Sequence, residues 1–242
     1  MIAASAVQAK NPHLAFVACP IVQDTSTVPC WLVQDHGETF YMGIQSDVSA
    51  DFNPPSLGHK VLVEGTMTDK MVCGARVIEP IRISIMPELS PECGELRVVR
   101  EGVDLGFEPP RPPGPSGGRL AFAPPAAPSL PKPPFSAKTF IVPYDFEGMV
   151  GFRTPYVLTP ALDYGQTIKA SRIEVTGYRG ATRLSDGRLL TEHQGIARER
   201  ANEVVRMLRG AGLDETRFTV VASEAPKEGG PELRRVEIKI IP

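Results

Sequence analysis

The sequence predicts a two-domain fold: an all-β small barrel over residues 11–100, a proline-rich linker over 101–137, and an α+β domain over 138–242. Three observations predict this division. Eleven prolines lie between Pro109 and Pro134, and such a segment favours extended polyproline II conformers over a core or a ladder. The residues before it form short β-branched and aromatic runs. The residues after it alternate between strand-like and helix-like patterns.

The first half consists of five or six short runs that are typical of strands: HLAFVAC, CWLVQD, ETFYMGIQ, HKVLVEG, GARVI and IRISIM. In the last of them Ile81, Ile83 and Ile85 alternate with other side chains, which is the period-two pattern of a half-buried strand. Their number and spacing indicate a small barrel, similar in topology to an OB-fold. Such barrels often bind nucleic acid, but residues 1–100 carry 7 basic and 11 acidic side chains, so we expect no nucleic-acid partner.

The second half has a different order of elements. TFIVPYDF is a strand, and a helix follows in which Thr159 is the cap and Pro160 the first helical residue. RIEVTGY is a buried strand, and TEHQGIARERANEVVRMLRGAG is a long amphipathic helix ended by Gly210 and Gly212. RFTVVAS and RRVEIKII are two further strands. The order β-α-β-α-β-β predicts a mixed sheet with its helices on one face.

Four cysteines, Cys19, Cys30, Cys73 and Cys93, all lie in the first half and indicate disulfide bonds. No CxxC pair occurs, and no histidine stands at a zinc-ligand spacing from them, so we expect no metal. We interpret them as two disulfides formed in an oxidising compartment, with buried free thiols as the alternative. Four cysteines allow three connectivities, and proximity along the chain favours Cys19–Cys30 with Cys73–Cys93.

The chain lacks a run of 18 apolar residues, so we expect no transmembrane span. Residues 1–10 are mostly small and apolar, and they end in a pattern similar to a signal-peptide cleavage site. We interpret them as the remnant of a signal peptide, with an ordinary N-terminus as the alternative. Together with the cysteines, they predict an exported protein.

Residues that could carry catalysis are sparse. The four histidines are scattered, no phosphate-binding glycine loop lies between a strand and a helix, and no nucleophile stands in a Gly-x-Ser-x-Gly elbow. Asp145 and Glu147 lie two apart on a strand and share a face, but a solvated strand edge explains them better than an acid–base pair. We therefore expect a non-enzymatic protein without a cofactor, and a hydrolase using the barrel is the weaker hypothesis.

Four short segments occur in a distinctive order: Leu158–Pro160 (LTP), Ile173–Tyr178 (IEVTGY), Arg200–Leu213 (RANEVVRMLRGAGL) and Arg234–Ile240 (RRVEIKI). With them, residues 138–242 resemble the C-terminal, peptidoglycan-associating domain of the OmpA family. The resemblance implies a location in the periplasm or at the outer membrane of a Gram-negative envelope. It also implies contact with the peptidoglycan stem peptide.

The resemblance implies a ligand site as well. In the family, an aspartate that ends the second strand and an arginine that begins the long helix hold the diaminopimelate of the stem peptide. Arg200 takes the arginine position, whereas Gly180 stands where the aspartate is expected. The other candidate ligand-binding residues lie beside these two positions: Tyr178, Arg179 in place of a threonine, His193 in place of an asparagine, and Asp186, which shares an extended loop with Glu192.

Arg200 is unusual because a helix over Gly195–Leu208 places its guanidinium within an otherwise apolar arc. Two interpretations remain open: Arg200 contacts a ligand, or it bonds to backbone carbonyls and braces the neighbouring loop. The first predicts an envelope protein that contacts peptidoglycan weakly, since the family's carboxylate is lost. The second predicts a degenerate module that serves as a protein-interaction scaffold for other envelope proteins.

Overall fold

The structure is a computed structural model, and it describes residues 12–25, 28–44, 55–98, 132–149 and 155–242. The expected signal-peptide remnant and most of the expected linker lie outside these ranges. The chain forms two compact units. The first comprises Met1–Pro109 with Leu184–Asp186, and the second comprises Pro110–Arg183 with Gly187–Pro242.

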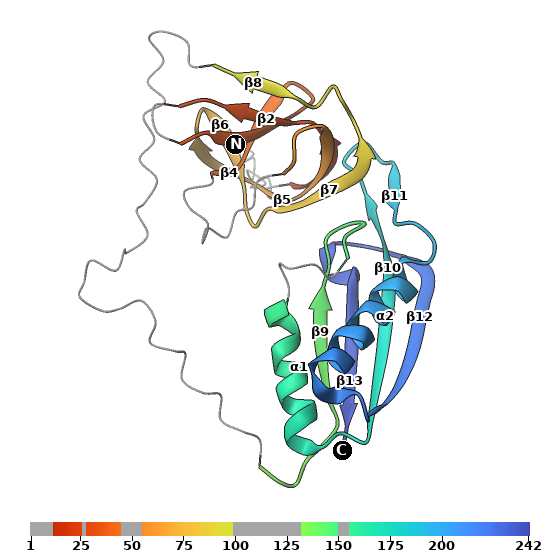
Figure 1. Ribbon diagram of the computed structural model, residues 1–242. Helices are drawn as coiled ribbons and strands as arrows, with labels where there is room; N and C mark the ends of the chain where they lie inside the picture. Colours follow the sequence, from red (N-terminus) through yellow and green to blue (C-terminus); the bar gives the residue numbers. More distant parts are fainter. Residues whose placement is uncertain (1–11, 26–27, 45–54, 99–131, 150–154) are drawn as a thin grey trace, which may run out of the picture. The chain divides into compact units, whose positions relative to one another are not determined.

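In the part of the first unit that the structure describes, the strands form one eight-stranded sheet (Figure 1). Its strands are β1 (His13–Ala18), β2 (Pro20–Gln23), β3 (Cys30–Asp35), β4 (Glu38–Ile44), β5 (His59–Val72), β6 (Ala75–Ile78), β7 (Arg82–Leu89) and β8 (Glu95–Arg97). The order is β1-β5-β6-β4-β3-β2-β8, and β7 pairs with β5. Ile81 and Ile83 pack against the core as their alternation predicts, but Ser84 on the opposite face of β7 is also buried.

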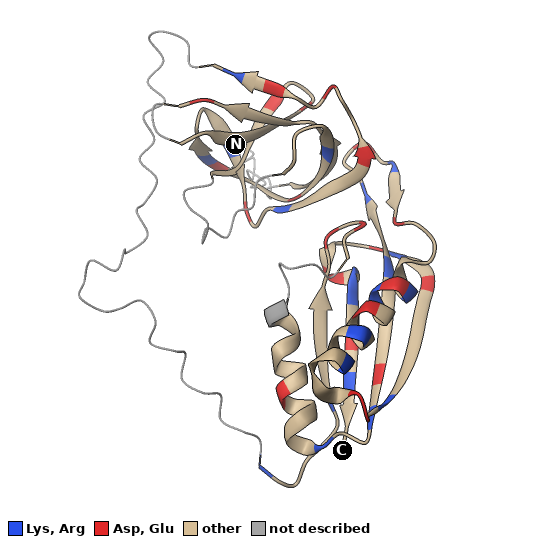
Figure 2. Cartoon of the chain, in the orientation of Figure 1, with Lys and Arg blue, Asp and Glu red and all other residues tan. Residues whose placement is uncertain are grey.

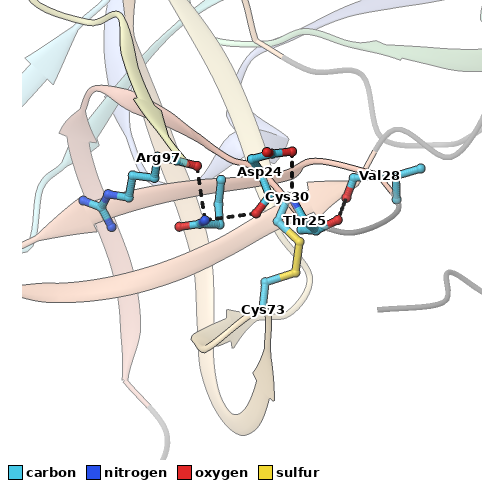
Figure 3. The surroundings of a disulfide bond; sticks show 7 residues. Asp24, Thr25, Val28, Cys30, Cys73 and Arg97 are labelled. Carbon is cyan, nitrogen blue, oxygen red and sulfur yellow. Dashed lines mark hydrogen bonds between the residues drawn. A yellow bond between two sulfur atoms is a disulfide. The ribbon is translucent and has the colours of Figure 1, made fainter. Parts of the chain in front are cut away.

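Two disulfides cross-link this unit, as the cysteine content predicts, but the expected pairing is wrong. Cys19 bonds to Cys93, and Cys30 bonds to Cys73. The reason is topological: β2 lies parallel to β8, which brings Cys19 to Cys93, so neighbours in space are not neighbours along the chain. Figure 3 shows the Cys30–Cys73 bond beside Thr25, whose hydroxyl donates to the Val28 carbonyl in the loop before β3.

The described residues of the second unit form a five-stranded sheet, two α-helices and two short helical turns. The elements are β9 (Lys138–Pro143), α1 (Pro155–Ile168), β10 (Arg172–Arg183), β11 (Leu189–Thr191), α2 (Ile196–Leu208), a π-helical turn η2 (Arg209–Leu213), β12 (Arg217–Glu228), a 3₁₀ turn η3 (Pro231–Leu233) and β13 (Arg235–Ile241). The sheet order is β11-β10-β13-β9, and β12 lies parallel to β10 on its other side.

Both α-helices pack on the same face of this sheet (Figure 1). Alternate residues of β10 and β13, including Ile173, Val175 and Ile238, are fully buried beneath Val204 and Leu208 of α2. The helix approaches β10 closely at Gly177, where a Cβ atom would overlap the backbone carbonyl of Ala197. Because backbone, not a flexible side chain, stands there, this position requires glycine.

Gly177→Ala is therefore expected to lower the free energy of unfolding by about 3 kcal/mol, the upper end of the usual cost of overpacking. The measurement is urea denaturation followed by far-UV circular dichroism. Gly210→Ala is the matched control, since a Cβ atom at Gly210 meets no neighbour within 4 Å. If both variants unfold at the wild-type urea concentration, the close approach of α2 to β10 is wrong.

The fold class expected from the sequence is wrong. The described residues are mostly β, with 51% of them in strands and 18% in helices, and they form two sheets, not a small five- or six-stranded barrel followed by an α+β domain. Strands run further than their apolar alternation indicates: β5 has 14 residues, and β10 and β12 have 12 each. Pairing with a neighbouring strand holds polar segments such as SEAPKE of β12 in the sheet.

Three details of the second unit also differ from expectation. The first helix begins at Pro155, so Pro160 lies inside it and is not its first residue. The short strand β11 was not predicted; it pairs with the end of β10 and forms a hairpin. The long helix α2 continues into η2, and inside this turn Gly212 has a φ of 101°, the left-handed conformation that glycine tolerates.

Candidate functional site

Arg200 lies in the second turn of α2, and its side chain is fully buried. The amphipathic pattern explains this position, because Ala197, Ala201 and Val204 share the buried side of the helix with it. A buried guanidinium must find partners for its N–H groups, since an unpaired one carries a large desolvation cost. The surroundings of Arg200 show which partners it has.

The main partner is Glu192, whose side chain is likewise fully buried. Arg200 Nη2 donates to Glu192 Oε1 at 2.6 Å and Nη1 donates to Oε2 at 3.1 Å, so the pair is bidentate. Arg200 also donates to two backbone carbonyls of the turn after β9: Nε to Gly148 O at 2.9 Å and Nη2 to Asp145 O at 3.0 Å. These two bonds are the contacts that the brace interpretation requires.

The ring of Tyr144 completes the surroundings of the guanidinium. The Arg200 Cζ atom lies 4.6 Å from the ring centroid, within the range of a cation–π contact. Burial raises the pKa of the Tyr144 hydroxyl above its usual range, so this phenol stays neutral. The guanidinium is thus held between an aromatic face, two carbonyls and a carboxylate.

Glu192 connects this cluster to the end of β10. Its Oε2 atom accepts the N–H of Gly180 at 2.7 Å, and its Oε1 atom accepts the N–H of Glu147 at 3.1 Å. A Cβ atom at Gly180 would lie 2.6 Å from Arg234 Cγ and 3.4 Å from Glu192 Oε2. The residue in the family's aspartate position is therefore a glycine whose own N–H binds the carboxylate of Glu192.

A second carboxylate holds the beginning of α2. Gly195, the N-cap, has a φ of 106° and no side chain that could accept the free N–H groups of the first turn. Glu224 of β12 accepts them instead, from Gly195 at 2.9 Å and from Arg198 at 3.2 Å. The predicted candidate Arg179 donates to the backbone carbonyls of Glu192 at 2.6 Å and of Glu224 at 3.3 Å, so it ties the two carboxylate segments together.

The predicted candidate His193 lies at the solvent edge of this cluster. Its Nδ1 atom is hydrogen-bonded to Glu147 Oε2, and its Nε2 atom lies 3.3 Å from Glu199 Oε2. The hydrogen bond to Glu147 is the main cause of a raised pKa of the His193 imidazole, and Glu199 raises it further. The protonated ring can donate to both carboxylates at once.

A pH dependence follows from the raised pKa of His193. Its stabilising contribution is complete below the ordinary pKa of 6.5 and is lost as the pH rises through the higher pKa of the folded state. We expect His193→Gln to destabilise the protein at pH 5.5 by less than about 1 kcal/mol, because the pair is partly exposed, and to have a smaller effect at pH 9. Urea denaturation of both proteins at the two pH values measures this. If the difference in unfolding free energy between the wild-type protein and His193→Gln grows with pH, the ion pair between His193 and Glu147 is wrong.

Of the six candidate ligand-binding residues, the structure brings four together: Arg200, Gly180, Arg179 and His193. The other two lie elsewhere. Tyr178 donates to Glu237 Oε2 at 3.0 Å, on the face of the sheet opposite the helices. Asp186 belongs to the first compact unit. The sequence did not indicate Tyr144 or the carbonyls of Asp145 and Gly148, because no motif marks a carbonyl acceptor in a turn.

The described residues also contain one group with potential metal ligands, Cys19, Glu92 and Cys93. Both sulfur atoms of this group form the Cys19–Cys93 disulfide and are therefore not thiolate ligands. Among the described residues, no helix has the length and hydropathy needed to cross a membrane. The two disulfides are consistent with an exported protein.

Comparisons with protein-family models, with curated proteins and with solved structures find no match to this chain. The resemblance of residues 138–242 to the OmpA family therefore rests on the four sequence segments alone.

Proposed function

We propose that this chain is a non-enzymatic, exported protein of the Gram-negative envelope, in which residues 138–242 are a degenerate OmpA-like module. On this proposal, the module acts as a protein-interaction scaffold and does not bind peptidoglycan. One observation carries the proposal: the Glu192 carboxylate occupies the guanidinium fork of Arg200, and both side chains are fully buried.

The guanidinium of Arg200 is the group to which a ligand's carboxylate would bind. In the family that residues 138–242 resemble, the arginine receives a carboxylate of diaminopimelate. Here Glu192 supplies a carboxylate from within the chain, with two bonds to Arg200 and further bonds from Gly180 and Glu147. A ligand would have to displace this carboxylate and leave it buried without its counter-ion, which is costly.

Co-sedimentation with purified sacculi at low salt tests the proposal, because charge contacts are strongest there. We expect the full chain to remain in the supernatant, while an OmpA-like domain that keeps both the aspartate and the arginine sediments. Retention of the chain that free diaminopimelate reverses would overturn the proposal and favour the peptidoglycan-contact hypothesis.

Gly180→Asp supplies a second arm of the same experiment. It restores the family's carboxylate, but we expect it to leave sacculus binding at background. The reason is steric and electrostatic: the new side chain would meet Arg234 Cγ and stand beside the carboxylate of Glu192. Strong binding by this variant would show that the arginine accepts a ligand after all.

A further inference from the structure

The face of the second unit's sheet that lies opposite α1 and α2 carries exposed side chains from four strands. The strand pairing defines this face, since residues paired directly across neighbouring strands share a side of the sheet. We call it the open face. It carries Thr139 and Ile141 of β9, Arg235, Glu237, Lys239 and Ile241 of β13, Arg172, Glu174, Thr176 and Tyr178 of β10, and Arg217, Thr219 and Val221 of β12.

The centre of the open face is one row that crosses all four strands. Ile141 pairs with Glu237, Glu237 with Thr176, and Thr176 with Val221. The two apolar ends of this row, Ile141 and Val221, are 57% and 48% exposed. These two aliphatic side chains are separated by Glu237 and Thr176, roughly 14 Å along the row, so they form no continuous apolar patch but offer two separate apolar contacts to a partner.

Cations outnumber carboxylates on the open face. Arg172, Arg217, Arg235 and Lys239 are accompanied by Lys227, whose Nζ atom lies 5.0 Å from the Tyr178 ring. The two carboxylates, Glu174 and Glu237, are both paired within the face. Glu174 lies 3.1 Å from Arg172 and 3.4 Å from Lys239, and Glu237 lies 2.8 Å from Arg235. The whole chain has a formal charge of −2, so this excess of positive charge is local.

The ring of Tyr178 stands within the basic part of the face. Arg235 Cζ lies 4.6 Å from the ring centroid, and the hydroxyl donates to Glu237. These contacts hold Arg235 and Glu237 against the ring. Tyrosine and arginine held in this way are typical anchors of protein interfaces.

We infer that the open face binds an acidic segment of another protein, with glutamate or aspartate side chains against the basic rows and small apolar side chains against Ile141 and Val221. This inference rests on the proposed function, for which it names the surface and the chemistry of the partner. Four strands and four rows of residues cover roughly 500 Å², which is less than the about 800 Å² of a standard interface side. The complex is accordingly weak and sensitive to salt.

The test uses the full chain and a fluorescent twelve-residue peptide in which six glutamates surround two leucines. A second peptide with lysine in place of glutamate is the charge control. Fluorescence anisotropy should show binding of the acidic peptide, with a dissociation constant that rises about tenfold between low and physiological salt. The lysine peptide should not bind.

Arg172→Glu/Lys239→Glu should abolish binding of the acidic peptide. The matched control is Arg198→Glu/Arg206→Glu, which makes the same charge change on α2, on the other side of the sheet, and should leave the affinity within about twofold. If the first double variant unfolds, Arg172→Gln/Lys239→Gln tests the same contacts without placing new carboxylates beside Glu174. It should weaken binding about tenfold.

The inference would be overturned by no binding of the acidic peptide, by equal binding of the lysine peptide, or by equal losses of affinity in both double variants. The inference would also be overturned if the chain does not bind the acidic peptide but binds phosphatidylglycerol vesicles, and loses this binding when Arg172 and Lys239 are replaced. The open face would then bind a lipid surface. Failure of the proposed function is seen separately, as retention on sacculi that diaminopimelate reverses.

Discussion

Arg200→Ala is expected to lower the free energy of unfolding of the second unit by about 3–5 kcal/mol, because it leaves the fully buried carboxylate of Glu192 without its counter-ion. The variant also removes the bonds to the carbonyls of Asp145 and Gly148, so the turn after β9 loses its link to α2. Urea denaturation of the full chain followed by far-UV circular dichroism measures the loss. Both α-helices of the described residues lie in the second unit, so this signal reports on it selectively.

A double variant separates the buried charges from the packing. Arg200→Met/Glu192→Leu removes both charges and keeps much of the side-chain volume, so it should be less destabilising than Arg200→Ala. Recovery should be incomplete, because the N–H groups of Gly180 and Glu147 lose their acceptor.

The matched control on the same helix is Arg206→Ala, whose side chain is 75% exposed. Its effect should stay within about 0.5 kcal/mol. If Arg200→Ala is as stable as the wild-type protein, Arg200 and Glu192 do not form a buried pair. Arg200 would then again be a candidate for ligand binding.

The burial of Arg200 could be predicted from the sequence, but its partners could not. Burial follows from the period of α2 alone, which places position 200 among Ala197, Ala201 and Val204. The partners come from loops: the carbonyls of Asp145 and Gly148 stand in a turn more than fifty residues earlier, and Glu192 follows a hairpin. Which way a carbonyl points in a turn depends on the folded backbone, and no residue type marks it in advance.

The lengths of the strands were also only partly predictable from the sequence. The ends of β12 and β10 could not be predicted from alternation, because SEAPKE and GATR are held in the sheet by pairing of Gly180 and Ala181 with Lys227 and Glu228. Apolar periodicity indicates only the part of a strand that lies over the core. The same reasoning applies to the cysteines: the composition predicted two bonds, whereas the pairing depends on β2 lying beside β8.

Loss of the two disulfides is expected to destabilise the first unit more than any single substitution proposed above. The Cys19–Cys93 bond closes a loop of 74 residues and the Cys30–Cys73 bond one of 43. In the chain-entropy model, loops of these lengths contribute roughly 4 kcal/mol each. Small domains have total stabilities of about 5–15 kcal/mol, so the reduced first unit should be largely unfolded at 37 °C.

Two spectroscopic signals distinguish this loss from general unfolding. Trp31, the only tryptophan of the chain, lies next to Cys30 in β3 and packs against the core of the first unit, so its fluorescence reports on that unit. The second unit contains no cysteine, so its helical circular dichroism is the internal control. Dithiothreitol should shift the Trp31 transition to lower urea concentration and leave the helical transition in place.

Serine pairs resolve the two bonds from one another. Cys19→Ser/Cys93→Ser and Cys30→Ser/Cys73→Ser each remove one bridge and should each lower the urea midpoint of the Trp31 transition. Pairs that follow chain proximity, such as Cys19→Ser/Cys30→Ser, break both bridges at once and should match the fully reduced protein. Suppose instead that Cys19→Ser/Cys30→Ser lowers the urea midpoint only as much as the loss of one bridge. The two replaced cysteines would then be bonded to each other, and the pairing of Cys19 with Cys93 and of Cys30 with Cys73 would be wrong.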